Sequence, residues 1–158
     1  MSGDEFVGIP PEERSTDLGT PDVTTMRSIR DLFVRAEPLV ETAALDSVLD
    51  PQEIQITFAD GVGDADWCRL DVTWYTSGAY RFHHVDGDGV NWRFDRHPNP
   101  HSPERHVHPP PDAPAQTAAE SCIRVEEPPL VARAVLKLWR RAYETGTHSA
   151  LNTATDPP

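Results

Sequence analysis

The stretch YRFHHVDGDGVNWRFD, residues 80–95, decides the fold. Two runs rich in aromatic and β-branched residues flank the turn sequence DGDG, a pattern that is typical of a β-hairpin. Direct pairing of Val85 with Val90 would place charged side chains of one strand beside aromatic side chains of the other. One additional turn residue, which a bulge at Gly87 or Gly89 allows, separates the two kinds of side chain.

With the longer turn, the hairpin has one polar face and one aromatic face. The polar face carries Arg81, His83, Arg93 and Asp95. The aromatic face carries Tyr80, Phe82, Trp92 and Phe94. Because a slip of one residue turns every side chain to the opposite face, burial of the aromatic rings selects this register. We therefore predict that Trp92 and Phe94 are buried and that Arg93 lies beside His83.

Other parts of the chain also show strand patterns. Apolar residues alternate, or β-formers cluster, at residues 54–58, 68–74, 79–85 and 90–95, with turn residues between them. The run SCIRVEE, residues 121–127, has the pattern of a short β-strand. We predict an antiparallel meander of about four strands.

Helical spacing of apolar residues appears at both ends of the chain. It predicts a helix at residues 24–36, a proline step at Pro38 and a second helix at residues 40–50. Two prolines then begin a C-terminal helix at residue 128, which Gly146 ends. The fold class is thus α+β, with N-terminal and C-terminal helices packed on the sheet.

The length of 158 residues fits one domain. We predict a flexible acidic lead-in at residues 1–23, a single α+β domain at residues 24–145 and a flexible tail at residues 146–158. The sequence has no run of eighteen apolar residues and no basic leader before an apolar segment, so we expect a cytoplasmic protein without membrane contact. Two cysteines, Cys68 and Cys122, are expected to be reduced thiols.

The net charge of −12 is unevenly distributed, because residues 1–66 contribute −11 and residues 67–158 contribute −1. Thirteen arginines accompany a single lysine, Lys137. An acidic, lysine-poor composition is expected of a halophilic protein, although a GC-rich genome also explains the preference for arginine. In molar salt the Debye length is about 3 Å, so the global charge would repel an RNA partner much less than in dilute buffer.

A histidine-rich segment follows the hairpin. Residues 97–111 read HPNPHSPERHVHPPP, with four histidines and six prolines. Because each proline removes a backbone donor, we predict a stiff loop that keeps the histidines near Arg93 and Asp95. If the backbone is extended at His106 and His108, both rings point the same way.

The hairpin and this segment together resemble the TumE family of prokaryotic toxins. The family pattern has a Tyr-x-Tyr-His strand, an Arg-Tyr-Asp strand, a Pro-His-His turn and a His-x-His motif near a proline. The matching residues are Tyr80 and His83, Arg93 to Asp95, Pro100 and His101, and His106 and His108. Arg96 and Ser102 differ from the pattern. The resemblance implies the toxin of a toxin–antitoxin module, with a cognate antitoxin as its partner.

These residue types are suited to RNA cleavage. We predict a metal-independent ribonuclease in which His101, His106 and His108 are the acid–base candidates. In this scheme Asp95 orients a histidine and Arg93 contacts the phosphate in the transition state. The predicted substrate-binding residues are Arg81, Tyr80, His83 and Arg96.

Two alternatives remain open. The first is a hydrolase with a divalent metal ion at His101, His106 and His108. The second is a non-catalytic interaction module that uses the aromatic residues of the strands to bind a partner. A homodimer is compatible with each of these functions. His84 and His148 have no matching partner in the sequence, and we expect no functional role for them.

Overall fold

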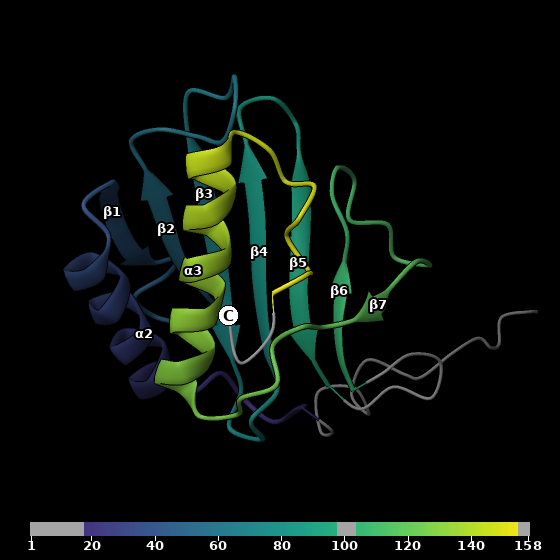
Figure 1. Cartoon of the computed structure of the whole chain (residues 1–158). Coiled ribbons are helices and arrows are strands. Elements are labelled where there is room, and N and C mark those ends of the chain that lie inside the picture. Colours follow the sequence, from purple (N-terminus) through teal and green to yellow (C-terminus); the bar gives the residue numbers. More distant parts are fainter. Residues whose placement is uncertain (1–17, 98–103, 155–158) are drawn as a thin grey trace, which may run out of the picture.

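The computed structural model describes residues 18–97 and 104–154. Within them, two helices pack on one antiparallel sheet of seven strands, which lie side by side in chain order (Figure 1). The helices are α2 (Val23–Ala36) and α3 (Pro128–Thr145). The strands are β1 (Val40–Leu45), β2 (Ile54–Phe58), β3 (Cys68–Trp74), β4 (Tyr80–Asp86), β5 (Asn91–Arg96), β6 (Arg105–His108) and β7 (Ala119–Glu120). The α+β class is confirmed, but the prediction of about four strands was wrong.

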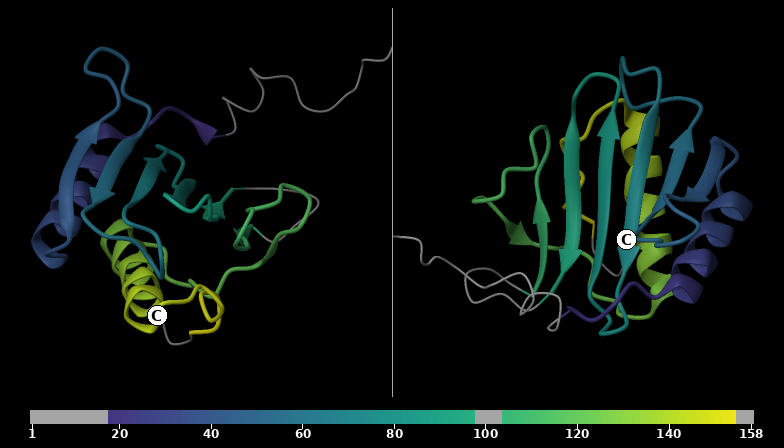
Figure 2. Two further views of the ribbon diagram at one scale, coloured as in Figure 1. Left: turned by 90° about the horizontal axis from the view of Figure 1, so that it is seen from above. Right: turned by 180° about the vertical axis from the view of Figure 1, so that it is seen from behind.

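Both helices cover the same face of the sheet, so neither helix of the described residues lies on the opposite face (Figure 2). The covered face carries the aromatic residues of the hairpin, and Trp92, Phe94 and Phe82 are fully buried there. Trp139 of α3 stacks on Phe58 of β2, with 4.3 Å between the ring centroids. This burial leaves no exposed aromatic strand face for the interaction module considered above.

The predicted register of the hairpin is confirmed. Arg81 lies opposite Asp95, and His83 lies opposite Arg93. Gly89 has a φ of +82°, a conformation that glycine adopts without steric cost. The Asp86 side chain closes the turn, because its Oδ1 accepts the backbone N–H groups of Asp88 and Val90 at 2.9 and 3.0 Å.

The helix predicted at residues 40–50 was wrong. Residues 40–45 form strand β1, in which Ala43 lies opposite Ile56 and Leu45 opposite Ile54. The helical spacing depended on Val48 and Leu49, which are 92% and 96% exposed in the loop between β1 and β2. Pairing with β2 decides the conformation here, because tertiary hydrogen bonds override the local pattern.

The ends of both helices follow ordinary capping chemistry. Asp22 Oδ1 accepts the Thr25 N–H at 3.1 Å at the start of α2, and Gly146 ends α3 with a φ of +75°. Arg140 of α3 pairs with the buried Glu37 at 3.0 Å, which links the two helices. Neither helix in the described part of the chain has the length and apolar character that crossing a membrane requires.

The segments before and after α3 differ from the strand predicted at residues 121–127 and the tail predicted at residues 146–158. Only Ala119 and Glu120 form strand β7, so the strand predicted at residues 121–127 was wrong. After α3 the chain returns to the sheet and buries Leu151 in the core. Asn152 holds this return by accepting the Cys122 N–H at 2.7 Å.

Candidate functional site

The candidate site lies on the sheet face without helices (Figure 2). Strand β6 brings two histidines onto this face, because His106 lies opposite Asp95 and His108 lies opposite Arg93. The predicted loop is therefore a strand at residues 105–108. The prolines permit this because none falls within those four residues. The expected proximity of His106 and His108 to the hairpin is confirmed.

Asp95 is the centre of this arrangement, and its side chain is buried with those of His106 and His108. Asp95 Oδ2 lies 3.5 Å from His106 Nε2 and 3.4 Å from His108 Nε2. The same oxygen accepts a hydrogen bond of 2.9 Å from Arg93 Nε. Asp95, His106 and His108 are hereafter called the open-face triad.

The charges around Asp95 determine its ionisation. Burial alone would raise the pKa of the carboxyl group, but the interaction with His106 and the charges of Arg93 and Arg81 outweigh it and lower the pKa. Arg81 Nε lies 3.9 Å from Asp95 Oδ1. Asp95 is therefore a carboxylate at neutral pH, with basic groups on two strands around it.

The hydrogen bond of His108 identifies which ring nitrogen carries the proton. His108 Nδ1 lies 2.9 Å from the Pro114 carbonyl oxygen. A carbonyl oxygen can only accept, so Nδ1 must donate. Nε2 of the neutral ring is then an acceptor that faces Asp95. Burial lowers the pKa of His108 and so favours the neutral ring.

The other predicted site residues lie in different places. His83 is on the same face and contacts Asn91 Oδ1 through Nε2 at 3.0 Å. Tyr80 is buried on the helix-covered face and stacks on Trp74. Arg96 Nε donates to Glu104 Oε2 at 2.7 Å. His101 lies outside the described residues, so its predicted role stays a prediction.

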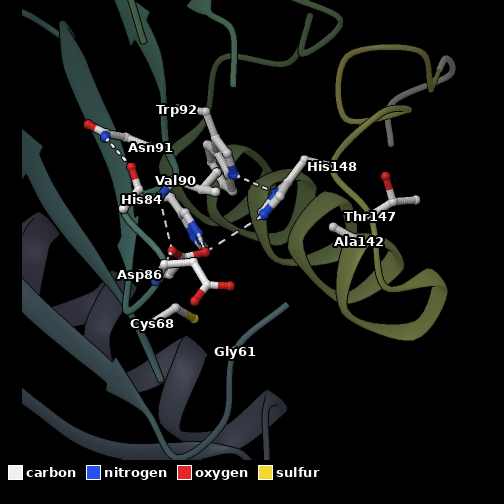
Figure 3. Close-up of polar contacts among 12 residues, drawn as sticks. Gly61, Cys68, His84, Asp86, Val90, Asn91, Trp92, Ala142, Thr147 and His148 are labelled. Carbon is white, nitrogen blue, oxygen red and sulfur yellow. Dashed lines mark hydrogen bonds and ion pairs between the residues drawn. The ribbon is translucent and has the colours of Figure 1, made fainter. Parts of the chain in front are cut away.

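The helix-covered face carries a second polar cluster, which was not predicted from the sequence. It consists of His84, Asp86 and His148 (Figure 3). Asp86 Oδ2 lies 3.6 Å from His84 Nε2 and 3.9 Å from His148 Nε2. The two histidines therefore share Asp86 as a partner, and the expectation that they have no functional role stays a prediction. The spacing of His84 and Asp86 in β4 could have indicated a shared face, but no local pattern brings in His148.

The fold and the open face together define a small α+β protein with a buried carboxylate–histidine site on the sheet face opposite the two described helices. A family model, described as Toxin TumE, matches residues 29–145. The chain belongs to the TumE toxin family, as the resemblance of the hairpin and the His-x-His motif implies. No curated protein and no solved structure matches the chain.

Proposed function

We propose that this chain is the toxin of a toxin–antitoxin module and that it acts by cleaving RNA at the open-face triad. Membership of the TumE family supports the toxin role. The observation that carries the proposed chemistry is the position of the triad, which joins a buried carboxylate, two imidazoles and neighbouring arginines on a sheet face that neither of the two described helices covers.

The arginines on this face are suited to a phosphodiester substrate. The side chains of Arg81 and Arg93 are 51% and 24% exposed, respectively, and both interact with Asp95. Guanidinium groups bind phosphate through planar, charge-assisted hydrogen bonds. A phosphate held by Arg81 and Arg93 would therefore lie next to the triad.

The reaction expected from the sequence needs no cofactor. The RNA 2′-oxygen forms a bond to the adjacent phosphorus, and a base takes the 2′-hydroxyl proton. The bond from phosphorus to the 5′-oxygen breaks, and an acid donates a proton to that oxygen. The products are a 2′,3′-cyclic phosphate and a 5′-hydroxyl group. His108 is poorly placed for either step, because Nδ1 bonds to Pro114 and Nε2 faces Asp95.

Purified protein and labelled RNA test the proposal. We expect cleavage by the native chain and a loss of at least about 100-fold in His106→Ala, since positioned acid–base groups contribute that much or more. His148→Ala is the matched control, because it removes a histidine from the opposite face. Both variants require a circular dichroism spectrum of the folded chain. Equal cleavage by the native chain and His106→Ala would disprove the assignment.

The antitoxin is the second part of the proposal. Expression of the chain alone should arrest growth, and co-expression of the adjacent gene should restore it. The His106→Ala variant should bind the same antitoxin without arresting growth. Growth arrest by a folded His106→Ala variant would show that the triad is not the source of toxicity.

A further inference from the structure

We propose that the open-face triad binds one divalent transition-metal ion of the zinc class, with water completing the coordination. Asp95, His106 and His108 provide one carboxylate oxygen and two imidazole nitrogens, and suitable ligand atoms lie within 4.8 Å of one another. A site with three protein ligands and one open position is the usual form of a catalytic zinc centre. Asp95 takes the position for which the sequence analysis considered His101.

The distances in the triad fit a bridging ion. With metal–ligand bonds of about 2.0–2.2 Å, two ligands of a tetrahedral ion lie about 3.4 Å apart. Asp95 Oδ2 lies 3.5 Å from His106 Nε2 and 3.4 Å from His108 Nε2. A direct charge-assisted hydrogen bond would be shorter, at about 2.7–2.9 Å. The spacing of the three groups thus corresponds better to ligands around an ion than to hydrogen-bonded partners.

The tautomer of His108 supports the same assignment. Because Nδ1 donates to the Pro114 carbonyl oxygen, the lone pair of Nε2 faces the carboxylate of Asp95. In the neutral ring this lone pair is available to a metal ion that lies between the imidazole and the carboxylate. Metal-bound histidines commonly donate their second N–H to a backbone carbonyl, which fixes the ring for coordination.

Asp95 has capacity for an additional partner. Its Oδ1 is buried and makes no hydrogen bond within the described part of the chain, where Arg81 Nε lies 3.9 Å from it. Oδ2 accepts a hydrogen bond of normal length from Arg93, the one such bond that residues 18–97 and 104–154 provide for it. An ionised carboxylate has about four lone-pair sites, so Arg93 and a metal ion can share it.

The cluster on the helix-covered face is a poorer candidate for the same ion. Trp92 Nε1 donates to His148 Nδ1 at 3.1 Å (Figure 3). The proton of a neutral His148 must therefore lie on Nε2, the atom that faces Asp86. Coordination through Nε2 would require either loss of this proton or loss of the Trp92 hydrogen bond. In the open-face triad Nδ1 of His108 donates a hydrogen bond, whereas in the other cluster Nδ1 of His148 accepts one.

The ion would activate water or a substrate oxygen next to the phosphate held by the arginines. This catalytic role rests on the proposed function, whereas binding of the ion does not. The two can therefore be tested separately.

Calorimetric titration of the full chain with Zn²⁺, after removal of metal by a chelator, tests the inference. We expect one bound ion per chain. Asp95→Asn and His108→Ala should each weaken binding by more than about 100-fold, because even changes behind the ligands can weaken a metal site that much. His148→Ala should leave the affinity unchanged. His106→Gln serves as an additional variant if one of the others fails to fold, as judged by circular dichroism.

The possible outcomes separate the sites and the proposals. Loss of Zn²⁺ binding in His148→Ala, with binding retained in Asp95→Asn, would place the ion at the other cluster and overturn the inference. No binding by the folded native chain would also overturn it. RNA cleavage that persists after the chelator has removed the metal would support the proposed function and reject the catalytic role of the ion, whereas the titration alone decides whether the site binds it. Zn²⁺ binding without RNA cleavage would support the inference and reject the proposed function.

Discussion

His84 shows how burial can control a single ionisable group. Its ring stacks on Trp92, with 4.7 Å between the centroids, and neither ring nitrogen makes a hydrogen bond. Burial and, to a smaller extent, the nearby His148 lower the pKa of His84 to about 3. The folded protein therefore keeps this ring neutral at pH values where the unfolded chain binds a proton.

We expect His84→Phe to stabilise the protein more at about pH 5 than at about pH 8. Because the pKa of His84 is lower in the folded protein, this residue does not oppose folding above the unfolded pKa of about 6.5. Stability falls as the pH drops below that value, since the unfolded chain then binds a proton that the folded protein does not. The native chain should lose about 2 kcal/mol from this group between about pH 8 and about pH 5. Urea unfolding of both proteins at the two pH values measures the difference. An identical pH dependence of the two proteins would contradict the expectation.

At the scale of elements, the alternation of apolar and polar side chains predicted the strand and its register correctly where one face of the strand is buried. In the hairpin, the aromatic and polar residues occupy opposite faces, so burial of Trp92 and Phe94 fixed both the register and the position of Asp95. After β1, the exposed loop residues Val48 and Leu49 extended the apolar spacing of the strand into a helix-like pattern. No local pattern could show that β2 needed a partner strand there.

The candidate site was predictable in part, because the sequence indicated which residues lie together but not all of their contacts. The His-x-His spacing indicated that both rings point the same way, and the stiff proline-rich segment indicated that they lie near Asp95. The bond from His108 to Pro114 depends on the path of the chain after β6, which the sequence does not specify. This contact makes Nδ1 the donor and leaves Nε2 of the neutral ring for the proposed metal ion.

The turn between β4 and β5 sets the register, and Gly89 is its sensitive residue. We expect Gly89→Ala to destabilise the protein by about 1–2 kcal/mol, because a left-handed conformation is unfavourable for alanine. A Cβ atom at Gly89 would meet nothing within 4 Å, so steric contact does not add to this cost. Gly89→Asn should cost less, since asparagine tolerates this region. Urea unfolding that gives equal stabilities for the two variants would contradict the conformational explanation.

At the scale of the whole molecule, the two faces of the sheet have different roles. One face holds the helices and the core, and the register of β4, β5 and β6 places the triad and its arginines on the other. The net charge of −12 opposes an RNA partner, so the proposed RNA binding depends on local positive charge on the open face. At physiological ionic strength the Debye length is about 8 Å, which screens charges on the far side of the molecule.

A pair of charge reversals separates the local charge from the global charge. Arg81→Glu on the open face and Lys137→Glu on α3 both change an exposed basic residue, and both make the net charge more negative by the same amount. If the open face binds RNA, Arg81→Glu should weaken binding of single-stranded RNA by at least about tenfold, because one charge-assisted phosphate contact contributes about 1.5–3 kcal/mol.

The salt dependence of binding completes this test, because it counts phosphate contacts. Loss of one contact with a single strand should reduce the slope of log affinity against log salt by about 0.7 in Arg81→Glu. Lys137→Glu should leave that slope unchanged and weaken binding only at low salt, where its charge is not screened. Fluorescence anisotropy over a range of salt concentrations measures both quantities. Equal losses in the two variants would mean that global charge, and not the open face, governs the encounter with RNA.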